Sequence, residues 1–155
     1  MLLTLIVWIG GIVFFTFVLA PTLFQVLPTT QMAGKVVNVT LTKLHWLGLI
    51  SGLVFMTCSL LYNLRNHAKL KLFGATHIFV LLMLVLTAVS QFGITYRMRQ
   101  LRATMETGDF PTPPFSVLRA EFDRLHAWST RLEGGVLFLG LGVVILTARR
   151  FEDRN

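Results

Sequence analysis

Four long apolar segments constrain this chain more than any other feature of its sequence. They occupy approximately residues 2–24, 42–62, 72–96 and 120–148, and the apolar part of the fourth begins at Trp128. About 20 helical residues cross the ~30 Å hydrocarbon layer of a bilayer, and only a helix satisfies its backbone hydrogen bonds within one segment. The sequence therefore predicts an all-α polytopic membrane protein, an up-down bundle of four transmembrane helices that forms a single domain over residues 1–155.

The overall composition supports lipid as the solvent of this chain. Hydrophobic residues make up 54% of the sequence and charged residues only 14%. The formal net charge of +7 comes from Lys and Arg in short clusters beside the apolar segments, where such residues contact phospholipid headgroups. We therefore expect the lipid bilayer as a partner and no nucleic acid.

The segments between the spans differ in character. Residues 25–41 are expected to form a polar connection, and residues 97–102 to extend the third helix beyond the membrane. Residues 108–114 contain Gly and Pro and should break that helix, after which Ser116 is suited to cap the next one. Pro21 directly after Ala20, and the lack of a basic start, indicate an uncleaved membrane anchor rather than a signal peptide.

Membrane orientation depends on the distribution of basic residues. Six lie on the face of the termini: Arg65, Lys69, Lys71, Arg149, Arg150 and Arg154. Six others lie on the opposite face: Lys35, Lys43, Arg97, Arg99, Arg102 and Arg119. The count is balanced, but the short and densely basic connection over residues 63–71 favours termini in the cytoplasm.

The polar chemistry of the chain is concentrated in residues 122–133, at the start of the fourth helix. Asp123, His126 and Glu133 fall, together with Thr130, at steps of three and four residues and so share one helix face. Because two spans separate their entry points, His45 of the second helix should lie at the same membrane level. Gln25, Gln91 and Tyr96 should reach that level as well.

Two imidazoles with nearby carboxylates suit a divalent transition metal or a proton-binding site. The predicted metal residues are thus His45, His126, Asp123 and Glu133. Two facing histidines could instead hold a haem iron axially. In a third interpretation these groups only satisfy one another near the interface, with Glu133 paired to Arg131 or Lys43.

No sequence pattern of a nucleophile elbow, phosphate loop or paired-carboxylate hydrolase occurs, and we predict no catalytic residues. The function predicted first is non-enzymatic ion or metal handling in the pocket of His45 and His126. The alternatives are a haem- or porphyrin-linked redox protein and a structural or partner-binding subunit.

Glycine pairs predict where helices approach closely. Gly48 and Gly52 form a Gly-x-x-x-Gly pair on the second helix, and Gly135 and Gly142 lie seven residues apart on the fourth. Such faces can pack within one bundle, or they can meet a second copy of the chain or another membrane protein.

The order of several short motifs resembles a known family. The residues are Trp8-Ile9-Gly10-Gly11, Ala20-Pro21-Thr22-Leu23-Phe24, Leu27-Pro28, Ala33-Gly34 and the stretch from Phe122 to Ser129. In these the chain resembles domain of unknown function 4149, a family of small bacterial membrane proteins related to eukaryotic transmembrane protein 205. The resemblance implies a four-helix protein of the bacterial inner membrane without an established reaction. At Glu133 the chain departs from the family pattern, which tends to have an amide there.

Overall fold

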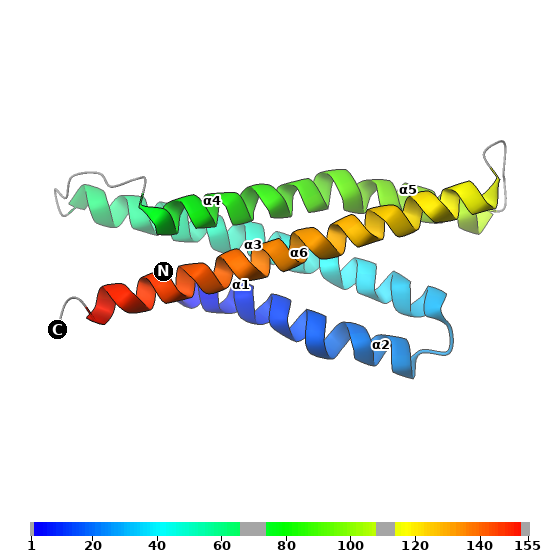
Figure 1. Cartoon of the computed structure of the whole chain (residues 1–155), viewed down its shortest axis with the longest axis horizontal. Coiled ribbons are helices and arrows are strands. Elements are labelled where there is room, and N and C mark those ends of the chain that lie inside the picture. The colour runs from blue at the N-terminus through cyan, green and yellow to red at the C-terminus, as the bar shows by residue number, and fades with distance from the viewer. Residues whose placement is uncertain (1, 66–73, 108–113, 153–155) are drawn as a thin grey trace.

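The computed structural model describes residues 2–65, 74–107 and 114–152, and nearly all of them are helical (Figure 1). The elements are α1 (Leu2–Phe14), the π-helix η1 (Phe15–Leu19), α2 (Ala20–Val26), α3 (Thr30–Arg65), α4 (Ala75–Ala88), the π-helix η2 (Val89–Thr95), α5 (Tyr96–Thr107) and α6 (Phe115–Glu152). The π-helices widen the turns without interrupting the helix, so α1–η1–α2 and α4–η2–α5 are each one continuous helix. We call these two long helices, together with α3 and α6, the four rods of the bundle. Neighbouring rods in sequence run in opposite directions.

The predicted fold class is confirmed. In the described part of the chain, four helices are long and apolar enough to cross a membrane: Leu3–Val26, Thr30–Tyr62, Ala75–Glu106 and Phe115–Thr147. No strand occurs in the ranges given above. The chain is an all-α, multi-pass membrane protein.

The second rod begins much earlier than the sequence analysis expected. α3 starts at Thr30, so most of the segment 25–41, expected as a connection, is helical and only residues 27–29 separate α2 from α3. Pro28 cannot donate a backbone hydrogen bond, and Leu27 is extended with ψ 141°, which ends α2. The Thr29 hydroxyl then accepts the amide of Met32 at 3.2 Å, as a helix cap does.

Of two other predictions about helix ends, one is confirmed and one is wrong. Residues 97–102 do extend the third rod, as α5. Ser116 is not the cap expected for the fourth helix, because α6 already begins at Phe115. The carbonyl of Pro114 accepts the amides of Val117 and Leu118 at 2.9 and 3.4 Å and closes that first turn.

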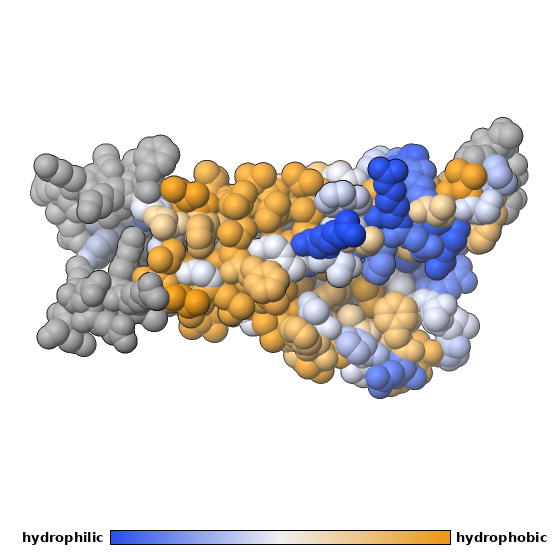
Figure 2. All heavy atoms as spheres, viewed as in Figure 1, coloured by the Kyte–Doolittle hydropathy of each residue, from blue (hydrophilic) through white to orange (hydrophobic). Residues whose placement is uncertain are grey.

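Polar parts of three rods pack together at one end of the bundle. α3 has 36 residues and is therefore about 54 Å long, well beyond the ~30 Å of a hydrocarbon layer. We call residues 30–42, 96–107 and 115–127 the polar extension; Figure 2 shows hydrophilic side chains gathered at this end and apolar ones along the middle of the bundle. Ion pairs and a hydrogen bond tie its helices together: Lys35–Glu106 at 3.1 Å, Arg97–Glu121 at 2.9 Å and Arg99–Asn38 at 3.1 Å.

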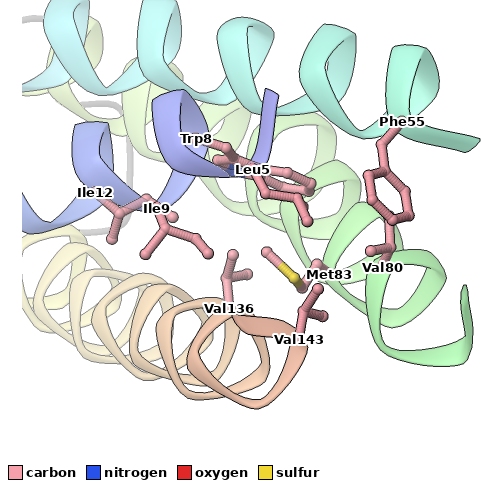
Figure 3. Packing of buried hydrophobic residues seen from close by; sticks show 9 residues of the cluster. All are labelled: Leu5, Trp8, Ile9, Ile12, Phe55, Val80, Met83, Val136 and Val143. Carbon is pink, nitrogen blue, oxygen red and sulfur yellow. The ribbon is translucent and has the colours of Figure 1, made fainter. Parts of the chain in front are cut away.

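The apolar core lies in the other part of the bundle (Figure 3). It contains Leu5, Trp8, Ile9, Ile12, Phe55, Val80, Met83, Val136 and Val143, all at most 8% exposed. The glycines singled out in the sequence lie around it. A Cβ added at Gly52 would meet Leu84 Cδ2 at 2.6 Å, and one at Gly142 would meet Phe79 Cε2 at 2.7 Å. At Gly135 the first contact, with Leu86 Cδ1, is an ordinary 3.5 Å.

Candidate functional site: a buried histidine between an amide and a carboxylate

Three helices bring His45, Gln91 and Glu133 into contact. His45 lies on α3, Gln91 on η2 and Glu133 on α6. The Nδ1 atom of His45 lies 2.8 Å from Gln91 Oε1, and its Nε2 atom forms a short contact with Glu133 Oε1. Both ring nitrogens are thus engaged, and His45 is only 2% exposed. We call these residues the polar centre.

The π-helix η2 helps to bury Gln91. In a regular helix adjacent side chains point about 100° apart, whereas a π-helical turn carries an extra residue and shifts the face that follows it. Within η2 the adjacent side chains of Ser90 and Gln91 are both buried, at 0% and 8% exposed, and so is Thr95 at 1%. Short π-helices often occur at functional sites. The local distortion here lets one helix present three polar side chains to the bundle interior.

The contacts restrict where protons lie in the polar centre. With the amide oxygen of Gln91 as acceptor, His45 carries a proton on Nδ1 and donates it. A single proton then lies between Nε2 and Glu133. Held on the nitrogen it gives an imidazolium–carboxylate pair, and held on the oxygen it gives a neutral imidazole–carboxylic acid pair. Both arrangements have zero net charge, which avoids the high cost of an unpaired charge in a low-dielectric interior.

Aromatic side chains mark the membrane level of the polar centre. Trp46 follows His45 on α3 and contacts Phe92, which follows Gln91, with ring centroids 5.9 Å apart. Both tryptophans of this region, Trp46 and Trp128, are 48% exposed. Exposed tryptophans gather at the boundary between hydrocarbon and headgroups. The polar centre therefore lies where the apolar spans meet the polar extension.

Of the four predicted metal residues, the structure brings only His45 and Glu133 together. His126 is exposed and stacks on Phe122, with the rings 6.5 Å apart and 4° from parallel. Asp123 is exposed and pairs with Arg119 at 3.2 Å. His126 lies two helical turns before Glu133, about 10 Å along the axis. Within residues 2–65, 74–107 and 114–152, no group of three or more His, Cys, Asp and Glu side chains is arranged to hold a metal ion.

The separation of His126 from His45 follows from how the rods diverge. His126 and Glu133 are seven residues apart and so occupy nearly the same face of α6. At Val136 this part of α6 is still covered by the core. Toward the polar extension, α2 turns away from α6 (Figure 1). The same helix face is therefore buried at one level and exposed two turns later.

The structure also adds polar groups to those predicted. Gln91 reaches the expected level, but its direct contact with His45 was not foreseen. Glu133 pairs with His45 rather than with Arg131 or Lys43. Ser129 is 4% exposed. The sequence signal for the contact of Gln91 was the pair Ser90-Gln91 inside an otherwise apolar span, because polar side chains there need partners within the protein.

A second buried histidine, on α4, contacts the C-terminal part of α3. His77 is 8% exposed, and its Nε2 atom lies 2.6 Å from the hydroxyl of Ser59. Along α3, Ser59 follows His45 by 14 residues, so the contact of His77 with Ser59 lies well apart from the contact of His45 with Gln91.

Comparison with known proteins places the chain in a family. The model of a family described as domain of unknown function (DUF4149) matches residues 3–107. The chain belongs to this family. No curated protein and no solved structure matches it.

The residues that match the DUF4149 model include only part of the polar centre. It covers α1 through α5 and so includes His45 and Gln91, whereas Glu133 on α6 lies outside the matched residues. The histidine–amide contact of this DUF4149 protein is thus made within the matched region. The carboxylate is supplied by the helix that follows it.

Proposed function

We propose that this protein is a non-enzymatic, ion-handling protein of the bacterial inner membrane, and that its ion is a proton held at the polar centre. The observation that carries the proposal is the buried imidazole of His45, contacted by Gln91 on one nitrogen and by Glu133 on the other. Ionisable side chains are expensive within a membrane and are generally kept there for function.

The polar centre holds one exchangeable proton, between Nε2 of His45 and the carboxylate of Glu133. Removing this proton leaves one negative charge on Glu133. The Glu133 side chain is 15% exposed, so it offers the route by which water reaches this proton. Ser90 lies next to Gln91 with a buried hydroxyl that has no hydrogen-bond partner among the described residues. Such a hydroxyl is suited to bind a water molecule in a proton path.

A divalent metal is the second candidate. His45 offers an imidazole nitrogen, and Glu133 and Gln91 offer oxygens, a donor set that borderline transition metals accept. The metal would have to replace the proton between Nε2 and the carboxylate. His126 and Asp123 would not reach this metal in the arrangement described. Because the haem alternative needs His45 and His126 on opposite sides of one iron, it receives no support from their separation.

The proton proposal is tested in proteoliposomes that contain a pH-sensitive dye. A potassium diffusion potential should drive proton entry with wild-type protein. Glu133→Gln keeps a hydrogen-bonding side chain but removes the exchangeable carboxyl proton, so it should abolish the flux. Glu121→Gln is the matched control, because Glu121 is a carboxylate of the same helix that pairs with Arg97 outside the polar centre.

Measurements on the purified protein decide between this proposal and the other candidates. Elemental analysis of purified protein should show a stoichiometric metal that is lost in His45→Ala if the metal candidate is right. Absence of both flux and metal, with a lower melting temperature in His45→Ala, would reduce the polar centre to a structural contact. A colourless, metal-free protein that purifies with another membrane protein would favour the partner-binding alternative. Gly48, Gly52 and Gly142 are covered by side chains of this chain, so a partner would have to use another face.

For the topology we propose cytoplasmic termini, on the basis of the short basic connection at residues 63–71. The opposite orientation is favoured by Arg124, which lies in the polar extension, and by Arg131, about one helical turn beyond it, because both add positive charge at that end. A fluorescent protein that folds only in the cytoplasm, fused after Asn155, decides between them. Fluorescence supports cytoplasmic termini, and a dark fusion with normal expression contradicts them.

A further inference from the structure

A groove on the outer surface of the bundle lies between η2 and α6. It is lined by Ile94, Glu121, Arg124, Leu125 and Trp128 and has a volume of about 460 Å³. Sites for small molecules commonly fall between ~300 and 1,000 Å³. The groove is therefore large enough for a bound molecule and lies apart from the polar centre.

The groove sits at the boundary between hydrocarbon and headgroups. Trp128 forms one wall and is half exposed, as is usual for interfacial tryptophan. On the hydrocarbon side the neighbouring surface is apolar, with Val89, which lies five residues before Ile94 on η2, 51% exposed. On the other side lie Arg97 and Arg119 of the polar extension. Lipid headgroups and the first carbons of their chains occupy this level of a bilayer.

The charges at the groove leave one cation available. Glu121 pairs with Arg97 at 2.9 Å, which offsets the carboxylate within the groove. The guanidinium of Arg131 lies 5.4 Å from the centre of the Trp128 ring. Arg124 is exposed and makes no ion pair or hydrogen bond with any residue that the structure describes. Its guanidinium is therefore free to bind an anion from outside the chain.

We propose that this groove binds the headgroup of an anionic phospholipid, with the phosphate held by Arg124. A guanidinium contacts two phosphate oxygens at once, and this bidentate contact is stronger than a neutral hydrogen bond. The apolar side chains of Ile94 and Leu125 and the ring of Trp128 would cover the glycerol backbone and the start of an acyl chain. This combination of one free cation with an apolar lining at the interface fits a lipid better than a water-soluble anion. The proposal does not depend on the function of the polar centre.

Native mass spectrometry of detergent-purified protein with added phosphatidylglycerol or phosphatidylcholine tests the site. Wild-type protein should retain phosphatidylglycerol in preference to phosphatidylcholine. A basic residue near an anionic headgroup contributes about 1 kcal/mol, so Arg124→Gln should weaken phosphatidylglycerol binding about five-fold. Arg124→Lys should restore part of the affinity. Because Arg124 is exposed, melting temperatures of these variants should match the wild type.

Arg119→Gln is the matched control, since it removes the same charge from the same helix where Arg119 already pairs with Asp123. It should leave lipid binding near the wild-type level. An equal loss in Arg119→Gln and Arg124→Gln would overturn the proposal in favour of diffuse attraction between charges. Equal retention of both lipids would also overturn it. Displacement of the lipid by excess inorganic phosphate would assign the site to a free anion instead.

Discussion

Replacing Gly48 with alanine tests how closely α1 and α3 approach each other. A Cβ at this position would lie 2.6 Å from Cε2 and 2.9 Å from Cδ1 of Trp8, whereas carbon atoms in contact prefer about 3.5–4.0 Å. Trp8 is 1% exposed and belongs to the apolar core, so its indole has little room to move away. Overpacking of this kind costs about 1–3 kcal/mol, partly offset by the ~1 kcal/mol gained when alanine replaces glycine in a helix.

Gly10→Ala separates these two contributions. A Cβ at Gly10 would meet nothing within 4 Å, so this variant gains helix propensity without a clash. Gly48→Ala should therefore be about 1–3 kcal/mol less stable than Gly10→Ala. For a chain of this size that corresponds to a melting temperature lower by about 2–12 °C. Loss of helical circular dichroism on heating in the same detergent measures the difference.

A second substitution identifies the atoms responsible. Trp8→Phe removes the pyrrole atoms that the new methyl group in Gly48→Ala would meet, so the stability difference between the Gly48 and Gly10 variants should largely disappear in that background. Residues in contact typically show coupling energies of about 0.5–3 kcal/mol in such a cycle. Equal melting temperatures for Gly48→Ala and Gly10→Ala, or no relief by Trp8→Phe, would refute the described packing of α1 on α3.

Three further predictions concern α6. Gly142→Ala should lower the melting temperature by a few degrees because its Cβ would meet the Phe79 ring, whereas Gly135→Ala, with only an ordinary contact, should not; thermal unfolding of both variants checks this, and an equal effect would contradict it. His126→Ala should change stability by no more than about 0.5 kcal/mol, since the side chain is exposed; a collapse of the folded state would show a buried role. Breaking the exposed Arg97–Glu121 pair with Arg97→Gln should cost about 0.2–1 kcal/mol and should cost less in high salt; a salt-independent loss would speak against an ionic contact.

The membrane spans could be predicted because their signal is local. An apolar run of sufficient length must become a helix in lipid, whatever surrounds it. The ends of the helices were harder to predict. Residues 30–41 are polar and were interpreted as a connection, but they form the start of α3. Their helix is stabilised by neighbours far away in sequence, through Lys35 to Glu106 and Asn38 to Arg99.

The candidate site could be predicted in part for a similar reason. Chain direction and span length sufficed to place His45, Gln91 and the fourth helix at one membrane level. Which side chains meet at that level depends on the packing of the rods. The π-helix η2 shifts the buried face of its rod at Gln91, and α2 turns away from α6 near His126. Periodicity of 3.6 residues assumes a regular helix with one constant neighbour, and neither condition holds there.

Hydropathy and span length are enough to establish a bundle of membrane helices with its polar chemistry near one interface, because both properties act residue by residue along the chain. The pairing of His45 with Glu133 rather than His126 could not be obtained in that way. It depends on the covered part of α6, which is set by how three helices pack and where a fourth diverges. The contact of His45 with Glu133 joins residues 88 positions apart, a distance at which no local pattern in the sequence carries information.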